Sequence, residues 1–517
     1  TPKEAIKLKN NIDALESKIH KVFATRKEGY IDPKTKKFIG TSENKMRVMM
    51  RTDTDESVRK ACFEAMEKMA IYVLDDYVKL VKLRNEFAKI LGYKDFYDYK
   101  IQIEEGMTKK ELFYIFDSIY SKTKFALKNI RGLEKTMPGL KHPWNFSFMM
   151  SGNFTSEEDK YFQFDEALMR WGKSFSALGV NFRKSKIYLD LLDRKGKYSN
   201  GFCHWPEIIS YQNGKRLPGR SNFTCNVVFG QVGSGVQGYA TLFHEGGHAA
   251  HMLNSDQTEV CINHEYAPMS TAWAETQSMF LDTIFGSIDW KTRYAKDKSG
   301  NSYPMELFER KTKKLHLLRP TDIYGIMFVC DFEKQTYEED KLDKNKVLNF
   351  AKRSYKKYYD MREDSLSVLN VPHIYSWESA ASYHGYGLAT IALTQWREYF
   401  HKKYGYIVDN PNVGREMTKV WKLAASKTFS ELVKIATNKK LSPEDYVESI
   451  TLSIDELFKK VNKRLQRMKK VKSYNKKVNL NAEIHMVSGK KEISNNTKSF
   501  EDMATKYKIW LNKGLKK

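Results

Sequence analysis

Apolar residues in the first third of the chain recur mostly at steps of three and four, which is the spacing of one face of an α-helix. The stripe is clearest in residues 57–91, and Gly92 follows it at the position of a C-terminal helix cap. We therefore expect a helical N-terminal lobe over residues 1–180. Further helical stripes within it cover residues 3–24, 108–135 and 156–178.

The pattern changes near residue 185 to short runs that alternate between apolar and polar residues, as β-strands do. Turn dipeptides such as Asn213-Gly214 and Pro218-Gly219 separate these runs, which favours strands that follow one another in an antiparallel sheet. The candidate strands are residues 187–191, 201–204, 207–211 and 221–229.

Helical spacing resumes at residue 238 and continues to about residue 465. The whole pattern predicts a mainly α fold with a small antiparallel β-sheet. We expect a second lobe over residues 181–462 that contains this sheet. Residues 463–517 are rich in lysine and only weakly periodic, and we expect a C-terminal appendix there.

Composition limits the classes of function. The net charge of +25 would attract nucleic acid, anionic membranes or acidic peptides. Lysine is spread along the chain, however, and no RNA-recognition or zinc-knuckle pattern accompanies it, so we expect no nucleic-acid partner. No run approaches 18 uncharged apolar residues, the length from which a membrane span is expected, so we expect no membrane association. Nothing in the sequence indicates an oligomeric state.

The five cysteines are scattered and include no C-x-x-C pair, which favours free thiols in a reducing compartment. The chain carries no secretory signal pattern at its start. We therefore expect a cytoplasmic location. The alternative is a mitochondrial or other organellar matrix, reached after removal of a targeting segment.

The segment from His244 to His248 reads His-Glu-Gly-Gly-His and carries the strongest chemical signal. Histidines four residues apart project from one face of a helix and can share one metal ion. Neutral imidazole suits zinc, and a catalytic zinc site takes three protein ligands with one position left open. Glu245 is rotated by about 100° around the helix, so we expect it beside the metal as a general base. The segment predicts one zinc ion per chain.

A third ligand is expected from a second helix, over residues 270–282. Glu275 is flanked there by small and apolar residues, and a carboxylate in such surroundings is costly unless it is paired or bound to metal. Asp282 lies two turns further on the same side and is expected to orient a ligand histidine. His251 and His264 are further candidates for the third ligand, ranked below Glu275. His251 shares the motif's face but is nearly two turns from His244, a long reach for the same ion, so we expect it beside the ligands.

The stretch from His244 to His251, H-E-G-G-H-A-A-H, resembles the thimet oligopeptidase and oligoendopeptidase F family of zinc metallopeptidases, whose pattern is H-E-x-G-H-x-x-H with a downstream glutamate ligand. The E-x-x-S of Glu275 to Ser278 fits the second part of that pattern. Arg194–Lys197 and Gly201–Cys203 resemble the sheet segment that precedes the zinc helix in this family. The resemblance covers roughly residues 60–455.

Further downstream, the segments around His373 and from Tyr383 to Tyr386 resemble the family's histidine and paired-tyrosine segment, whose groups bind substrate and stabilise the oxyanion. The resemblance implies catalytic roles for His373, Tyr383 and Tyr386, and a substrate-binding role for Tyr375. A glycine-rich loop precedes the zinc helix, and we expect Gly233 and Gly235 in it to line the substrate channel. A plain connector is the alternative for this loop, and a dinucleotide site lacks the acidic residue it requires.

The resemblance also implies a two-lobed helical shell around a deep substrate channel, with the small sheet near the zinc. The implied function is endopeptidase hydrolysis of short peptides. A related carboxypeptidase or dipeptidyl carboxypeptidase is one alternative. A catalytically silent protein that keeps the metal and binds peptides is another, although the intact Glu245 counts against it. The net charge leaves a helical nucleic-acid- or anion-binding protein as a third.

Overall fold

The computed structural model describes residues 2–198, 200–264 and 268–514. The chain forms two compact units. Unit 1 comprises the residues up to Asn153, Arg194–Tyr198 and Leu315–Gly387; unit 2 comprises the rest. These units do not follow the boundaries expected from the sequence, because the chain passes between them several times. The change from helical to alternating apolar spacing near residue 185 marks a change of secondary structure and not a change of unit.

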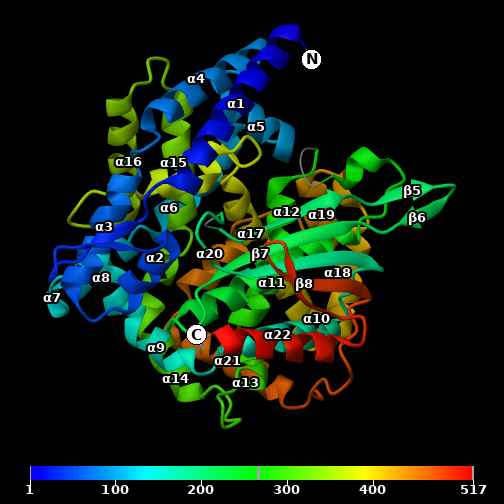
Figure 1. Ribbon diagram of the computed structural model, residues 1–517. Helices are drawn as coiled ribbons and strands as arrows, with labels where there is room; N and C mark the ends of the chain where they lie inside the picture. The colour runs from blue at the N-terminus through cyan, green and yellow to red at the C-terminus, as the bar shows by residue number, and fades with distance from the viewer. Residues whose placement is uncertain (1, 199, 265–267, 515–517) are drawn as a thin grey trace. The chain divides into compact units, whose positions relative to one another are not determined.

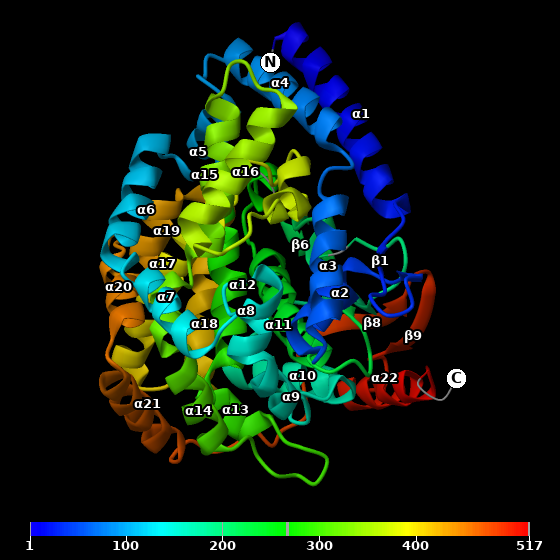
Figure 2. The same cartoon turned by 90° about the vertical axis from the view of Figure 1, so that its left-hand side faces the viewer.

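Unit 1 consists mainly of helices packed in pairs. Helix α1 (Lys3–Thr25) lies against α4 (Leu74–Ile90), and α15 (Tyr324–Glu338) lies against α16 (Lys344–Tyr359) (Figures 1 and 2). The other α-helices of the unit are α2 (Glu43–Thr52), α3 (Glu56–Met69), α5 (Phe96–Glu105), α6 (Lys109–Thr123), α7 (Ala126–Thr136) and α8 (Pro143–Ser147). Its short helical segments are η1 (Phe148–Gly152), η4 (His316–Thr321), η5 (Ser367–Asn370) and η6 (Pro372–Tyr375). Strands β1 (Gly29–Ile31) and β2 (Phe38–Gly40) form a small hairpin.

The single helix expected over residues 57–91 is two helices, α3 and α4, separated by a turn. Met69 at the end of α3, Val73 in the turn and Tyr77 in α4 are all buried. The apolar spacing therefore continues through the break and does not reveal it.

Unit 2 contains a five-stranded sheet with the order β4-β7-β3-β8-β9. The central strand β3 (Ser185–Leu192) pairs in parallel with both β7 (Arg220–Val227) and β8 (Ala482–Ser488), whereas β4 (Phe202–Glu207) and β9 (Lys491–Asn495) pair in an antiparallel sense at the edges. The sheet is mixed, and the expectation of an antiparallel sheet is wrong in this respect. Local turn signals indicated hairpins, but they carry no information on a partner strand near the C-terminus.

The lysine-rich segment after residue 462 supplies β8, β9 and helix α22 (Phe500–Gly514), which lie together in Figure 2. Ile484 and Met486 of β8 are fully buried. The Phe500 ring occupies the space where Gly172 has no side chain, and a Cβ at Gly172 would overlap it. This segment is therefore part of the core of unit 2 and not an appendix.

Helix α11 (Ser234–Leu253) lies against β7 and beside α12 (Thr271–Gly286) (Figure 1). Helix α17 (His384–Tyr404) begins in unit 1 and continues into unit 2. The remaining elements of unit 2 are α9 (Asn153–Asp159), η2 (Phe164–Glu166), α10 (Ala167–Leu178), β5 (Ser210–Gln212), β6 (Lys215–Leu217), η3 (Val260–Asn263), α13 (Ile288–Tyr294), α14 (Met305–Leu315), α18 (Pro411–Trp421), η7 (Ala424–Ser426), α19 (Phe429–Thr437), α20 (Glu444–Thr451) and α21 (Ile454–Met468).

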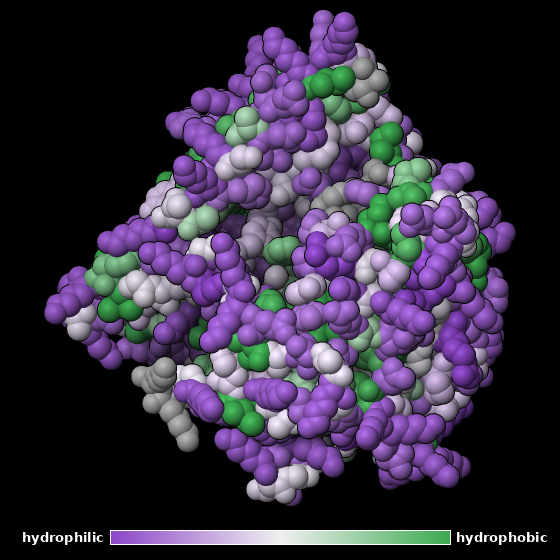
Figure 3. Space-filling view, turned by 45° about the vertical axis from the view of Figure 1, so that its right-hand side comes forward, coloured by the Kyte–Doolittle hydropathy of each residue, from purple (hydrophilic) through white to green (hydrophobic). Residues whose placement is uncertain are grey.

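The expectation of a mainly α protein with a small sheet is confirmed. Hydrophilic side chains dominate the face seen in Figure 3, and hydrophobic ones are scattered among them. Across the described ranges, no helix has both the length and the apolar character that a membrane crossing requires.

Candidate active site

The side chains of His244, His248 and Glu275 meet where α11 and α12 lie side by side. One ligand atom from each lies within 4.8 Å of the others. Glu275 Oε2 is 3.3 Å from His244 Nε2 and 3.4 Å from His248 Nε2. Within residues 2–198, 200–264 and 268–514, no other group of three histidine, cysteine or acidic residues has this geometry. Two imidazole nitrogens and one carboxylate oxygen form a donor set that zinc accepts.

The two glycines of the motif allow α11 to approach its neighbours closely. A Cβ at Gly247 would lie 2.7 Å from the Cα of Ser278 on α12. A Cβ at Gly246 would lie 2.7 Å from the indole nitrogen of Trp171. Glycine is unfavourable inside a helix by about 1 kcal/mol relative to alanine. Here that loss allows the contact that brings Glu275 to the two histidines.

Polar groups behind the ligands fix their orientation. His244 Nδ1 donates to Asp282 Oδ2 at 3.0 Å, which leaves Nε2 of the ring free to face the other two ligands. Ser278 Oγ donates to Glu275 Oε2 at 3.0 Å. The structure thus places Asp282 in the orienting position predicted from its two-turn spacing.

His251 forms no such link. Its ring is fully buried, and neither ring nitrogen has a hydrogen-bond partner among the described residues. It lies against the Trp273 ring at a centroid distance of 6.5 Å. Burial lowers the pKa of His251 to about 3, so the ring is neutral. The structure places this residue in the core beside the site, without the hydrogen bond that a supporting role would use.

Glu245 lies outside the ligand group and is only 5% exposed. Gly201, just before β4, lies against it: a Cβ there would be 3.2 Å from Glu245 Oε1. Trp205 of β4 approaches His248 at a centroid distance of 6.3 Å. The motif alone did not identify Gly201 or Trp205. Gly201 did fall within the sheet segment that carried the family resemblance, but its contact with Glu245 exists only in the folded chain.

Burial is the largest single influence on the pKa of each of these groups, although charged neighbours outweigh it at Glu275 and His244. It raises the pKa of Glu245, against the opposing effect of the two histidines, and it also raises the pKa of Asp282. Burial alone would raise the pKa of Glu275 too, but the charges of His248 and His244 hold it well below its ordinary value. Burial would lower the pKa of His244, but its bonds to Asp282 and Glu275 raise it well above the usual value. Glu275 is therefore the ionised ligand, and Glu245 is the better proton acceptor.

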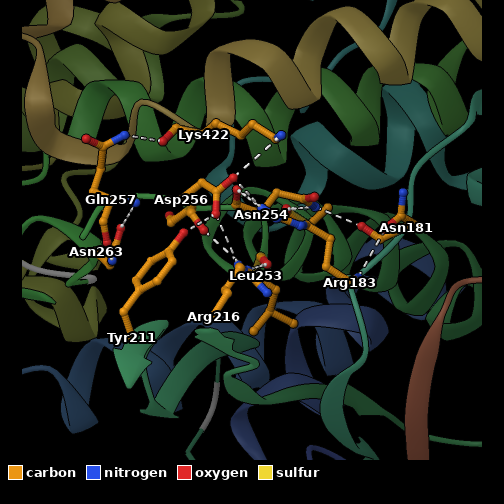
Figure 4. Close-up of polar contacts among 12 residues, drawn as sticks. Asn181, Arg183, Tyr211, Arg216, Leu253, Asn254, Asp256, Gln257, Asn263 and Lys422 are labelled. Atoms are coloured by element: carbon orange, nitrogen blue, oxygen red, sulfur yellow. Dashed lines mark hydrogen bonds and ion pairs between the residues drawn. The ribbon is translucent and has the colours of Figure 1, made fainter. Parts of the chain in front are cut away.

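A polar network around Asp256 holds the C-terminal end of α11 (Figure 4). Asp256 forms ion pairs with Arg183 at 3.0 Å and Arg216 at 3.3 Å, and it accepts a hydrogen bond from Tyr211 Oη at 2.6 Å. Arg216 also donates to the carbonyl oxygens of Leu253 and Ser255, at 2.7 and 3.2 Å. These bonds satisfy carbonyl groups that a helix end leaves without partners. The helix that carries the histidines is thus fixed at its far end.

The predicted histidine and tyrosine residues form a second cluster, in unit 1. His373 Nε2 and Tyr386 Oη are hydrogen-bonded at 3.1 Å. The Tyr383 ring lies 5.2 Å from the ring of His373 and 4.9 Å from that of Tyr386. All three side chains are partly exposed. The structure thus brings the three predicted residues together, and their catalytic roles stay a prediction.

The structure does not support the substrate-binding role expected for Tyr375. Its side chain is 1% exposed, and its hydroxyl donates to the carbonyl oxygen of Leu369 at 2.6 Å. It packs edge-on against Tyr77 at 5.3 Å. Tyr375 is a core residue of unit 1, because the short η6 turn that exposes His373 directs Tyr375 inward.

Gly233 and Gly235 lie at the start of α11, where the backbone itself makes the contacts. The Gly233 N–H donates to Asp159 Oδ1 at 2.7 Å, in a conformation with a φ of +82°. A Cβ at Gly235 would overlap the carbonyl oxygen of Phe162. Gly235 lines a cavity of 570 Å³, but none of His244, His248 and Glu275 lines it. The left-handed φ explains the glycine at 233 and close packing explains the one at 235, and the role of both in substrate binding stays a prediction.

Comparison of this chain with models of known protein families identifies one matching family. The family model described as Peptidase family M3 matches residues 49–452. No curated protein matches the chain.

Solved structures show the same fold. They include PZ peptidase A with an inhibitor (18% identity, 90% of this chain and 78% of that chain covered, TM-score 0.62) and a structure described as an oligoendopeptidase F (14% identity, 90% and 78% covered, TM-score 0.64). An M32 carboxypeptidase from Deinococcus radiodurans R1 is also similar (14% identity, 86% and 88% covered, TM-score 0.52). At these identities the similarity establishes the fold.

Proposed function

This chain belongs to peptidase family M3 and is a metallopeptidase, and we propose from this premise that it is a zinc-dependent endopeptidase that hydrolyses short peptides. The observation that carries the proposal is the group of His244, His248 and Glu275, with Glu245 buried beside it. The group offers three ligands, the number that a catalytic zinc site takes from the protein.

A bound zinc ion supplies Lewis-acid chemistry, which activates water and polarises a carbonyl. The protein's own groups do the rest. Glu245 takes the proton from the attacking water and passes it to the leaving amine, and its raised pKa suits both steps. Asp282 holds His244 in the tautomer that presents Nε2 to the metal.

We assign the cluster of His373, Tyr383 and Tyr386 to the developing oxyanion and the substrate backbone. Phenol and imidazole groups donate hydrogen bonds, and a donor aimed at a developing charge contributes about 3 kcal/mol to the transition state. The partial exposure of the three side chains and the bond between His373 and Tyr386 support this assignment.

Cleavage of an internally quenched peptide of about ten residues tests the proposal. The native protein is compared with Glu245→Gln, and zinc content is measured in the same preparations. Loss of the base lowers kcat by at least about 10²-fold, while zinc stays near one per chain. Glu306→Gln is the matched control, because that side chain is 80% exposed in the same unit. Failure of the zinc-loaded native protein to cleave varied peptides would overturn the proposal and favour the silent peptide-binding protein.

A carboxypeptidase is the second candidate, and the fold shared with the M32 carboxypeptidase favours it. Two peptides that differ only in a free or an amidated C-terminus separate the two activities. An endopeptidase cleaves both at internal bonds. A carboxypeptidase or dipeptidyl carboxypeptidase rejects the amidated peptide.

We propose a reducing compartment for the protein, the cytoplasm first and an organellar matrix second. No disulfide bond joins any of the five cysteines, all of which lie in the described ranges. Fractionation of cells with an antibody to the protein tests this, and recovery from the culture medium would contradict it.

A further inference from the structure

The segment between Ile374 and His384 in unit 1 has little regular structure, yet much of it is buried. It follows His373 directly, and Tyr383 and Tyr386 lie at its end. Backbone groups in a buried irregular segment need partners that regular structure does not provide. In this segment, ionisable side chains from four different helices provide partners, in addition to hydrogen bonds within the turns.

The first part of the segment is held by Arg84 and Glu16. Arg84 is fully buried in α4 and donates to the carbonyl oxygen of Ile374 at 2.9 Å. Its other nitrogen donates to Glu16 Oε1 of α1 at 2.8 Å. Glu16 Oε2 in turn accepts from the Trp377 N–H at 3.0 Å.

The middle of the segment is held by Lys100 and Glu104 of α5, which form an ion pair with each other. Lys100 donates to the carbonyl oxygens of Trp377 and Glu378, at 3.1 and 3.0 Å. Glu104 Oε2 accepts from Ser382 Oγ at 2.7 Å. Both ionic side chains are buried.

The last part depends on Glu333 of α15, which is 1% exposed. Glu333 Oε1 accepts from the Ala381 N–H at 2.8 Å. Ala381 is itself fully buried and has a φ of +55°, a left-handed conformation that is strained for a residue with a Cβ. Such strain costs about 1–2 kcal/mol and persists only where the surroundings impose it. Glu333 is the one described residue with a hydrogen bond to this strained peptide unit's N–H.

We propose that Glu333 is a positioning residue: by holding the Ala381 peptide in the left-handed conformation, it directs the chain so that Tyr383 and Tyr386 reach their working positions. This inference rests on the proposed function. The conformation at Ala381 sets the direction in which α17 starts, three residues later. The same turn brings the Tyr383 and Tyr386 rings together. If Glu333 served only to stabilise the fold, its effect on catalysis would not depend on the backbone conformation of Ala381.

The experiment compares Glu333→Leu, which removes the acceptor, with Glu333→Gln, whose amide oxygen keeps it. Glu67→Leu is the matched control. Glu67 is a partly buried carboxylate in the same unit that accepts from the Leu366 N–H and from Ser365 Oγ, both at 2.7 Å, and it does not contact the tyrosine segment through these bonds. We measure kcat, KM, zinc content and the melting temperature of each variant.

For Glu333→Leu we expect kcat to fall about 10- to 100-fold with KM changed less than about threefold, since misplaced oxyanion donors weaken the transition state more than they weaken substrate binding. Glu333→Gln is expected to keep kcat within about threefold, because the hydrogen bond survives. Glu67→Leu is expected to lower the melting temperature but to keep kcat per zinc-loaded molecule. Adding Ala381→Gly to Glu333→Leu should restore several-fold of the lost kcat, because glycine adopts this φ without strain. An unchanged kcat in Glu333→Leu, or equal losses in Glu333→Leu and Glu67→Leu, would overturn the inference.

Hydrogen exchange of peptides covering residues 380–387 provides a readout without catalysis. Exchange there should speed up in Glu333→Leu and stay near the native rate in Glu333→Gln and Glu67→Leu. If the native zinc-loaded protein fails to cleave peptides, the proposed function fails, and this exchange pattern still decides whether Glu333 holds the segment. Unchanged exchange in Glu333→Leu would contradict the positioning role in either case.

Discussion

At the scale of single residues, the approach of the metal ligands depends on the absence of a side chain at Gly247. Gly247 faces the backbone of α12, and backbone atoms have little freedom to move aside. The histidines and Glu275 are brought together by this crossing. The site therefore depends on a residue that has no functional group.

We predict that Gly247→Ala destabilises the protein and lowers zinc content. The new Cβ would lie 2.7 Å from the Ser278 Cα, and overpacking of this kind costs about 1–3 kcal/mol. The gain in helix propensity is about 1 kcal/mol and only partly offsets it. Urea unfolding and zinc analysis measure both effects. Gly132→Ala in α7 is the control, since nothing lies within 4 Å of its Cβ position and a small gain in stability is expected. Normal zinc content and stability in Gly247→Ala would contradict the prediction.

Glu333 should also give the protein a characteristic pH dependence of stability. Burial raises the pKa of Glu333 to about 7, although Arg84 and Lys100 oppose this. The folded chain therefore keeps this proton between pH about 4.5 and 7, where the unfolded chain releases it. Stability falls as the pH rises through this range, by up to about 3 kcal/mol.

Glu333→Gln lacks this titration, so we expect its free energy of unfolding to exceed that of the native protein more at pH 8 than at pH 5. Urea unfolding of both proteins at the two pH values measures the difference, and groups common to both cancel. A difference that does not change with pH would show that Glu333 titrates at its ordinary value.

Residue spacing alone could identify most of the metal site. The four-residue interval between the histidines, the apolar flanks of Glu275 and the two-turn interval to Asp282 are properties of single helices, and the structure places these side chains together. The role expected for Tyr375 is wrong, because similarity between segments does not tell which of two neighbouring side chains faces inward. Gly201 was missed as a contact of Glu245 because that contact exists only after folding.

The helix that carries the metal ligands is the decisive element, and its two ends are held differently. Its start is held by the hydrogen bond from the Gly233 N–H to Asp159 and by the close approach of Gly235 to the Phe162 backbone. Its end is held by the charged network around Asp256. The far end therefore depends on several charged side chains, whereas the start depends on one carboxylate and on close packing.

We predict that Asp256→Asn destabilises the protein by about 1–3 kcal/mol, because Arg183 and Arg216 lose their counter-charge while they stay largely buried. Zinc content should be retained, since the ligands lie nearer the middle of α11. Urea unfolding with zinc analysis checks this. The control Asp75→Asn, in a pair whose carboxylate is 71% exposed, should change stability by less than about 0.5 kcal/mol. Equal effects of the two substitutions would refute the role of the network.

At the element scale, helix and strand types were predictable and their partners were not. The helix of residues 3–24 and the strand of residues 187–191 appear as α1 and β3. The parallel pairing of β3 with β8 could not be predicted, because β8 is a short strand inside a lysine-rich segment. Its two buried residues, Ile484 and Met486, are too few to stand out in such surroundings.

Over the whole molecule, the basic charge is the property that no single element explains. The chain carries 88 lysines and arginines against 63 acidic residues. Such an excess creates a long-range field that concentrates anionic ligands and speeds their association. The metal site itself contains three carboxylates, Glu245, Glu275 and Asp282, so the excess lies elsewhere on the protein.

We predict that the protein prefers acidic peptides at low salt. At 10 mM ionic strength charges act over about 30 Å, whereas at 1 M they act over only about 3 Å. Two quenched peptides with the same residues around the cleaved bond, one with acidic and one with basic ends, should differ in kcat/KM by about tenfold at 10 mM salt. The ratio should fall toward one at high salt, because screening removes the field but not the contacts at the cleaved bond. A neutral peptide of equal length serves as the control, and its kcat/KM should change little with salt. Equal rates for the acidic and basic peptides at low salt would show that the net positive charge serves another purpose. A preference for acidic peptides that survives 1 M salt would place the selectivity in direct contacts at the site.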